Sequence, residues 1–200
     1  RGWMFAAGEE RRRLLEALEE SCRWARALHC DTVMSPVDAG RGDPARAAAS
    51  IREAGELAAA HGVRLALEPN CLAEQFRTLQ SVREVLALAG HPGCGLLFDT
   101  YHFQRSGSAP EELDALRDGE LAYVQYSDVP ARPADPGQTL DRLPPGQGAV
   151  PFREILDRLV GRYHGYLSYE APNPAAWARP AADVAREALA ASRRLLAPRS

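Results

Sequence analysis

Segments with the period of a helix and short apolar segments typical of strands alternate strictly along this chain of 200 residues. Apolar side chains keep a helical spacing over residues 9–28, 43–62, 78–90, 110–116, 151–161 and 180–196. Between them lie five strand-like runs, at residues 31–37, 63–68, 95–99, 121–128 and 165–170. This alternation predicts an α/β fold with a parallel sheet rather than an antiparallel meander.

Local signals mark where several of these helices begin or end. Asp43 followed by Pro44 is the usual pair of an N-cap and a first helical residue. Thr78 is predicted to cap the next helix, and Gly90 is predicted to end it. These residues support the helix boundaries independently of the apolar period.

Each of the last four predicted strands has a polar residue at or near its end, namely Glu68, Asp99, Gln125 and Glu170. A buried strand gains nothing from an unpaired carboxylate at its end, because taking the ion out of water costs roughly several kcal/mol. In a (β/α)8 TIM barrel the carboxyl ends of all strands surround one mouth, which carries the chemistry. We therefore expect a barrel, because strands far apart in a doubly wound sheet need not converge.

The length of the chain qualifies this expectation. A closed (β/α)8 barrel usually needs about 250 residues, whereas this chain has 200 residues and five predicted βα units. We expect a single domain over residues 1–200 that corresponds to the C-terminal part of such a barrel and lacks about three N-terminal strands. The chain also starts on Arg1 without a methionine, which suggests a fragment.

The polar strand ends predict a metal site. Three carboxylates brought within a few ångströms repel one another, and a divalent cation relieves the repulsion. Gln125 adds a neutral carbonyl oxygen, so the ligands would be Glu68, Asp99, Gln125 and Glu170. An all-oxygen set favours Mn²⁺ or Mg²⁺ over Zn²⁺, with Co²⁺ as an alternative. For any one of these residues alone, capping of the following helix is an equally good interpretation.

Other polar residues follow the same strands. His102 lies three residues after Asp99 and is predicted to face the substrate as a donor. The candidate substrate-binding residues are Asn70, Arg105, Arg142 and Trp177. The arginines could clamp a phosphate or carboxylate, and Trp177 could be a lid or could pack on the last helix. The Gly-rich run "PPGQG" at residues 144–148 offers backbone amides that could cover a ligand.

Composition argues against some other classes of protein. Lys and Arg number 24 against 27 Asp and Glu, a net charge of −3, so no nucleic-acid partner is indicated. No apolar run is long enough to span a bilayer, which predicts a cytoplasmic protein without a membrane partner. The four cysteines show no CxxC spacing and are expected to be reduced.

Five segments together resemble one known family, and they read "LALEPN", "GLLFDTYHF", "YVQYSDVP", "DRLPPGQG" and "GYLSYEAPNP". They are similar to the xylose-isomerase-like TIM-barrel superfamily, in particular its sugar phosphate isomerase/epimerase branch, from about residue 15 to the end. The resemblance implies that Glu68, Asp99, Gln125 and Glu170 bind a divalent metal, and that Glu68 and Glu170 also act as acid and base. The epimerases often have histidine where this chain has Gln125; glutamine there is similar to 3-dehydroshikimate dehydratases.

The expected function is that of a metal-dependent isomerase or epimerase acting on a sugar or sugar phosphate through an enediolate, with carboxylate acid/base catalysis by Glu68 and Glu170. One alternative is a lyase that dehydrates 3-dehydroshikimate or a similar keto-polyol. Another is a non-catalytic barrel fragment that acts as a binding module. The sequence does not identify the substrate or the oligomeric state. A homo-oligomer is one possible state.

Overall fold

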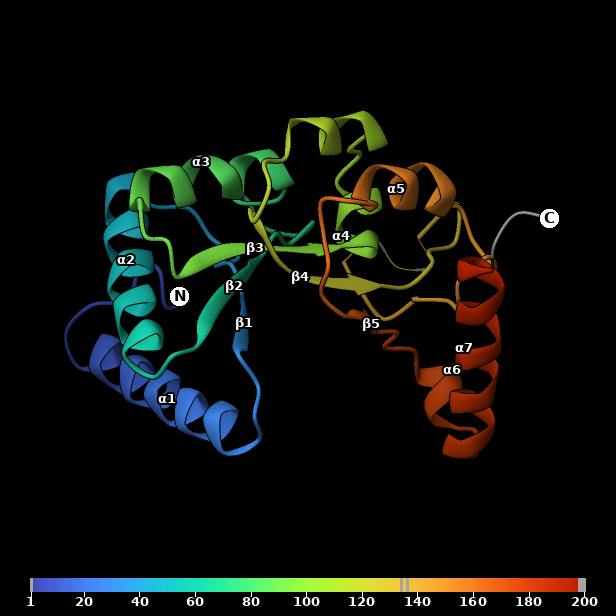
Figure 1. Ribbon diagram of the computed structural model, residues 1–200, viewed down its shortest axis with the longest axis horizontal. Helices are drawn as coiled ribbons and strands as arrows, with labels where there is room; N and C mark the ends of the chain where they lie inside the picture. Colours follow the sequence, from blue (N-terminus) through green and yellow to red (C-terminus); the bar gives the residue numbers. More distant parts are fainter. Residues whose placement is uncertain (1, 134, 136, 198–200) are drawn as a thin grey trace. The chain divides into compact units, whose positions relative to one another are not determined.

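Five strands form one sheet whose order, β1-β2-β3-β4-β5, is the order of the chain in this computed structural model (Figure 1). They are β1 (Thr32–Pro36), β2 (Arg64–Glu68), β3 (Cys94–Asp99), β4 (Leu121–Tyr126) and β5 (Leu167–Tyr169). The structure describes residues 2–133, 135 and 137–197. Parallel pairing aligns Val33 with Leu65, Leu65 with Cys94, and Val124 with Leu167. Sequential parallel strands joined through helices have the connectivity of a TIM barrel, so the predicted fold and its five strands are confirmed.

The chain packs into two compact units, which are described separately. The first unit comprises Arg1–Phe98 and Arg117–Tyr123, and the second comprises Asp99–Leu116 and Val124–Ser200. Strands β1 and β2 therefore lie in the first unit and β5 lies in the second, while β4 contributes residues to both. The expectation of one domain over residues 1–200 stays a prediction.

Three helices belong to the first unit, α1 (Gly8–Ala27), α2 (Pro44–Ala60) and α3 (Leu79–Ala89). Helix α1 contacts β1, and α2 contacts both β2 and α3 (Figure 1). The Asp43 carboxylate accepts a hydrogen bond from the Ala45 amide at 3.0 Å, and Thr78 and Ser81 form a reciprocal capping box. Gly90 ends α3 with a φ of 63°, in the left-handed region that glycine adopts without strain. The predicted helix ends are confirmed.

The second unit contains shorter helices, α4 (Thr100–Arg105), the 3₁₀ helix η1 (Pro110–Ala115), α5 (Phe152–Leu159), α6 (Pro174–Trp177) and α7 (Ala181–Leu196). The sequence does not predict α4. Six residues are too few for an apolar period to show. The helix nevertheless forms because Asp99 caps it.

A hydroxyl joins the start of α4 to the end of β4 inside the second unit. Thr100 Oγ1 donates to the Ser127 carbonyl at 2.7 Å and accepts from the Ser127 amide at 3.0 Å. Both residues are buried. Reciprocal bonds of this kind hold the residue after Asp99 against the strand end that follows Gln125, and they order the polar side chains nearby.

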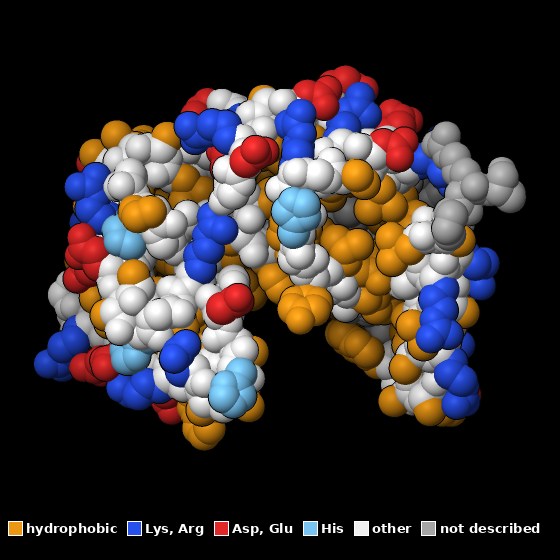
Figure 2. Space-filling model, viewed as in Figure 1, with side chains coloured by type: hydrophobic (Ala, Val, Ile, Leu, Met, Phe, Trp, Pro, Cys, Tyr) orange, Lys and Arg blue, Asp and Glu red, His pale blue; other side chains and the backbone are white. Residues whose placement is uncertain are grey.

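The surface shown in Figure 2 mixes charges of both signs. Basic and acidic side chains are interspersed over the helices at the top of the view. Among the described helices, none combines the length and the hydropathy that crossing a bilayer requires. All four cysteines are free thiols: Cys22, Cys71 and Cys94 are buried, and Cys30 is exposed.

Candidate functional site

The two carboxylate oxygens of Asp99 have different partners: one caps α4, and the other contacts the side chain of Arg142. It is the last residue of β3 and is 2% exposed. Oδ1 accepts hydrogen bonds from the backbone amides of Tyr101 at 2.6 Å and His102 at 3.3 Å, which makes Asp99 the N-cap of α4. Oδ2 lies 2.6 Å from Nη1 of Arg142. Capping and participation in a polar site are thus compatible at this residue.

Arg142 provides the cation at the centre of this cluster. Its side chain is 4% exposed. Besides Asp99, Nη1 contacts Glu170 Oε2 at 3.1 Å and the Glu170 carbonyl at 3.3 Å. The guanidinium also lies over the ring of Tyr101, 4.5 Å from its centroid. A buried guanidinium is tolerated only when it is paired, and here two carboxylates and an aromatic face pair with it.

His102 is a buried, neutral imidazole beside Arg142. Its Nε2 lies 3.3 Å from Arg142 Nη2. Because a guanidinium can only donate, Nε2 accepts and the ring proton is assigned to Nδ1. Burial lowers the pKa of His102 to about 4; Asp99 opposes this and Arg142 adds to it. The imidazole is therefore uncharged near neutral pH.

Glu170 is the accessible carboxylate of the cluster. It directly follows β5, and its backbone amide donates to the Tyr126 carbonyl at 3.1 Å. Its side chain is 38% exposed. Burial raises the pKa of Glu170, Arg142 lowers it, and the charge and hydrogen bond of Asp99 raise it, with a net upward shift. A carboxylate that reaches solvent and holds a proton more readily than usual suits proton transfer.

Gln125 has a buried side-chain amide oxygen for which the described residues provide no hydrogen bond. The residue lies in β4 and is 7% exposed. Within the part of the chain that the structure describes, its Oε1 has no hydrogen-bond partner. A buried carbonyl oxygen normally has a partner. A carbonyl oxygen of this kind is a suitable ligand for a hard divalent cation, and the metal-binding role of Gln125 stays a prediction.

Glu68 belongs to the first unit. It is the last residue of β2, is 6% exposed and is aligned with Pro36 of β1. Its carbonyl accepts a hydrogen bond from the Val37 amide at 3.0 Å. Strand β2 pairs in parallel with β3 within this unit, from Leu65 with Cys94 to Leu67 with Leu96. The role of Glu68 as a fourth ligand stays a prediction.

The remaining candidate substrate-binding residues are Asn70, Arg105 and Trp177, and each has a different local environment. Asn70 Oδ1 accepts from the Leu72 amide at 2.9 Å in a turn of the first unit. Arg105 Nη2 pairs with Asp141 Oδ2 at 2.8 Å, and its guanidinium lies over the ring of Tyr101. Trp177 is 65% exposed on α6. Their predicted contacts with a substrate stay predictions.

Sequence analysis missed Asp128, a fully buried carboxylate that organises the loop after β4. Its oxygens accept hydrogen bonds from the backbone amides of Gly146, Gly148 and Val150 at 2.8, 2.8 and 2.9 Å. The idea that the amides of "PPGQG" cover a ligand is therefore wrong for both glycines, because those amides are bonded to Asp128. The acidic residue of "YSD", just beyond a strand, was the available signal.

Asp141 was missed as well. It accepts from the Tyr101 hydroxyl at 2.6 Å and from Arg105, so it docks the residue before Arg142 onto α4. The arginine that joins the cluster is thereby positioned by its neighbour in the sequence.

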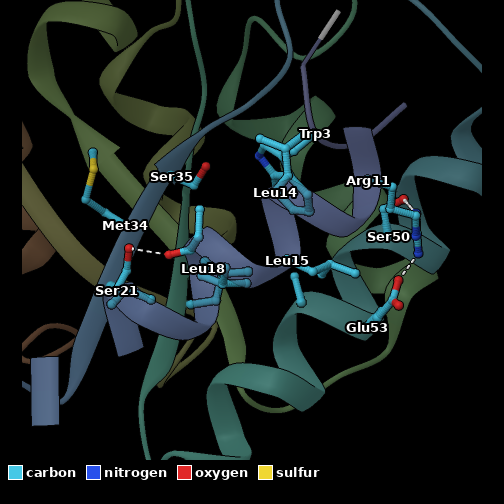
Figure 3. Close-up of a pocket in the computed structure, with 14 residues that line it drawn as sticks. Trp3, Arg11, Leu14, Leu15, Leu18, Ser21, Met34, Ser35, Ser50 and Glu53 are labelled. Atoms are coloured by element: carbon cyan, nitrogen blue, oxygen red, sulfur yellow. Dashed lines mark hydrogen bonds and ion pairs between the residues drawn. The ribbon is translucent and has the colours of Figure 1, made fainter. Parts of the chain in front are cut away.

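The first unit contains a cavity of about 220 Å³ between α1, β1 and α2 (Figure 3). Its walls are mostly apolar, with Leu14, Leu15 and Leu18 on one side. Its charged residues, Arg11 and Glu53, form an ion pair with each other. None of the candidate ligands lines it. We therefore place the candidate site at the polar cluster of Asp99, where the titratable groups converge.

Sequential parallel strands with carboxylates at their C-terminal ends define a protein of the TIM-barrel class. The family described as "Xylose isomerase-like TIM barrel" matches residues 1–195. The chain belongs to this family. The resemblance noted in the sequence is thereby confirmed.

Two curated relatives are enzymes. An inosose isomerase of Halalkalibacterium halodurans is 28% identical over 129 residues, which are 62% of this chain and 45% of that protein. A 3-dehydroshikimate dehydratase of Pseudomonas aeruginosa is 28% identical over 142 residues, which are 70% of this chain and 22% of that protein. The chain thus spans less than half the length of either relative.

A solved structure supports the fold independently. The IOLI protein, whose crystal structure is described as having a zinc atom bound, superposes with a TM-score of 0.84 at 19% identity. The match covers 96% of this chain and 72% of that one. At this identity the likeness is one of fold.

Proposed function

We propose that this chain is part of a divalent-metal-dependent isomerase or epimerase that acts on a sugar or sugar phosphate through an enediolate. The observation that carries the proposal is the donor set at the strand ends of the second unit. Asp99 Oδ2 and Glu170 Oε2 contact one cationic group, and Gln125 Oε1 is buried without a hydrogen-bond partner among the described residues. The inosose isomerase relative supports the reaction class.

Asp99, Gln125 and Glu170 would hold the metal, with Glu68 as the fourth ligand from the neighbouring strand. Oxygen ligands favour Mn²⁺ or Mg²⁺, with Co²⁺ as an alternative. The related IOLI structure contains zinc, so the identity of the metal is a matter for titration. When bound, such an ion acts as a Lewis acid toward a substrate carbonyl and its neighbouring hydroxyl.

The proton transfers are assigned to Glu170 and Glu68. Glu170 is partly exposed, and its raised pKa favours uptake of the proton from the carbon next to the carbonyl. Glu68 would return a proton to the other face or to the neighbouring carbon. His102, neutral and buried, would offer a hydrogen bond without adding charge.

The substrate would be a small sugar or keto-polyol. Asn70, Arg105, Arg142 and Trp177 are the proposed contacts with it. Arg142 has the strongest support, because its guanidinium already lies among the proposed ligands. A cytoplasmic location and the absence of a nucleic-acid partner stay predictions from composition.

A lyase that dehydrates 3-dehydroshikimate is the second candidate. It is supported by the dehydratase relative, which matches 70% of this chain, and by glutamine at position 125. If a leaving hydroxyl is located β to the enolate, the same acid and base eliminate water instead of returning the proton. The two reactions differ in the substrate rather than in the residues required.

Binding of Mn²⁺, followed by titration calorimetry, tests the site. We expect one ion per chain, with binding lost in Asp99→Asn and Glu170→Gln and retained in Glu56→Gln, which alters an exposed glutamate of α2. Glu68→Gln tests the fourth ligand in the same assay. Binding that persists in both Asp99→Asn and Glu170→Gln would refute the site.

Turnover then separates the reactions. Solvent deuterium that enters a ketose without a new chromophore indicates the isomerase, whereas growing aromatic absorbance with 3-dehydroshikimate indicates the dehydratase. A folded chain that neither binds Mn²⁺ nor turns over either class of substrate would favour the third interpretation, a non-catalytic binding module.

A further inference from the structure

The Nη1 amino group of Arg142 contacts an oxygen of each of two carboxylates. Nη1 lies 2.6 Å from Asp99 Oδ2 and 3.1 Å from Glu170 Oε2. A cation that coordinated Asp99 Oδ2 and Glu170 Oε2 would compete with the guanidinium for the same two oxygens. We propose that Arg142 is an internal counter-cation of the metal-free protein, and that a divalent ion binds only by displacing its guanidinium from Asp99 and Glu170. This inference rests on the proposed metal site.

The charges of the cluster explain why the two cations exclude each other. In the metal-free protein the guanidinium compensates carboxylates that would otherwise repel, one of them 2% exposed. A divalent ion that coordinated Asp99 Oδ2 and Glu170 Oε2 would take the place of the guanidinium beside both oxygens. Two cations at the same oxygens also repel each other, so the guanidinium would leave them.

The other polar groups beside the guanidinium are uncharged. His102 Nε2 accepts from Nη2 but is neutral. Ser127 Oγ, 3.4 Å from Nη1, is also neutral. Neither can replace the carboxylates as a counter-ion.

The backbone around Arg142 is anchored, so the exchange needs only side-chain motion. Asn173 Nδ2 donates to the Arg142 carbonyl at 2.9 Å. On one side Asp141 is held by the Tyr101 hydroxyl, and on the other Leu143 forms a two-way backbone bridge with Asp128. The loop can thus remain in place while the torsions of one arginine change.

Replacement of Arg142 by methionine tests the competition, because it keeps much of the side-chain length and removes the charge. We expect Arg142→Met to bind Mn²⁺ about tenfold or more tightly than the parent chain in titration calorimetry, since the competing cation is gone. We also expect a lower Tm without metal, and a larger rise in Tm at saturating Mn²⁺ than in the parent.

Arg158→Met is the matched control. It removes another guanidinium of the second unit, one that pairs with Glu111 and Asp114 rather than with Asp99. Its Mn²⁺ affinity should stay within about threefold of the parent, because the charge that it removes is not in contact with the proposed ligands.

The outcomes separate this inference from the proposed function. Equal Mn²⁺ affinity in the parent and Arg142→Met overturns the competition and leaves the metal site intact. Weaker binding in Arg142→Met also overturns it, and would assign Arg142 to positioning the ligands. Absence of Mn²⁺ binding in the parent and in both variants overturns the metal site and this inference together.

A second measurement applies if Arg142→Met does not fold. NMR of the parent chain labelled with ¹⁵N-arginine reports the Nε–H group of Arg142, assigned by comparison with Arg142→Lys. Saturating Mg²⁺ should shift this signal and speed its exchange with water, as expected for a guanidinium released from a buried ion pair. An unchanged signal under saturating Mg²⁺ would overturn the proposal.

Discussion

Asp99 and Arg142 form a buried ion pair, 2.6 Å from Oδ2 to Nη1, between residues 43 positions apart in the chain. Meanwhile Asp99 Oδ1 caps α4. One residue thus combines a local role that is readable from the sequence with a long-range role that depends on the path of the loop after β4. The two roles can be separated by substitution.

Asp99→Asn should keep the cap and lose the ion pair, because asparagine is as good an N-cap as aspartate. We expect a loss of about 3 kcal/mol in the free energy of unfolding, since a buried guanidinium loses a charged partner. Urea denaturation of the metal-free chain measures it. Asp43→Asn, at the exposed N-cap of α2, is the control and should change stability by less than about 0.5 kcal/mol. Equal losses in the two variants would contradict the prediction.

The stability of the metal-free chain should fall as pH decreases below 6.5. The pKa of His102 is about 4 in the folded chain against 6.5 ordinarily, so the unfolded chain takes up the proton first. The stabilisation is complete above pH 6.5 and decreases as pH falls toward 4, by up to about 3 kcal/mol. Urea denaturation from pH 7.5 to 5 with a chelator present measures the slope.

His102→Gln should have a shallower slope over this range, because the titrating imidazole is gone. His164→Gln alters an exposed histidine of the second unit and should keep the slope of the parent chain. If the parent and His102→Gln have the same slope, another group causes the pH dependence.

Gly148→Ala should destabilise the loop after β4. A Cβ at this position would lie 2.1 Å from the Val129 carbonyl oxygen and 2.6 Å from Asp128 Oδ1, so the backbone must shift. We expect a cost of about 1–3 kcal/mol, typical of overpacking. At Gly40 a Cβ meets nothing within 4 Å, so thermal unfolding of Gly40→Ala should match the parent. A Gly148→Ala protein with the parent's Tm would show that the loop is not held as described.

One of the four thiols should react quickly with Ellman's reagent. Cys30 is exposed, whereas Cys22, Cys71 and Cys94 are buried. Burial also raises the pKa of Cys94 to about 11, which keeps its thiol protonated at pH 8. We expect a rapid phase of one thiol per chain that is absent in Cys30→Ser. A rapid phase that survives this substitution would mean that a buried cysteine becomes accessible.

Local sequence signals were sufficient for most of the fold. The apolar periods predict the five strands and the long helices, and Asp43, Thr78 and Gly90 predict helix boundaries that the structure confirms. Such signals act within a few residues, so they can be read without knowing the path of the chain. Helix α4 was missed because six residues carry too little period.

Only part of the candidate site could be predicted from the sequence. The polar strand ends predicted that Asp99 and Glu170 need a cation, and a metal was the cation considered. The arginine that meets both carboxylates comes from a loop, and its placement depends on Asp128 and Asp141, whose partners lie up to 40 residues away. No local pattern encodes such pairings.

The sequence by itself determined the alternation of helices and strands, the polar residues at the strand ends and the family. The alternation follows from side-chain period and local capping, the polar residues are read directly, and the family follows from the resemblance of five segments. Only the tertiary structure decided that Arg142 neutralises Asp99 and Glu170 and that Asp128 secures the loop behind it. The physical reason is that buried charges are stable only in pairs, and the partner is chosen by the folded path of the chain.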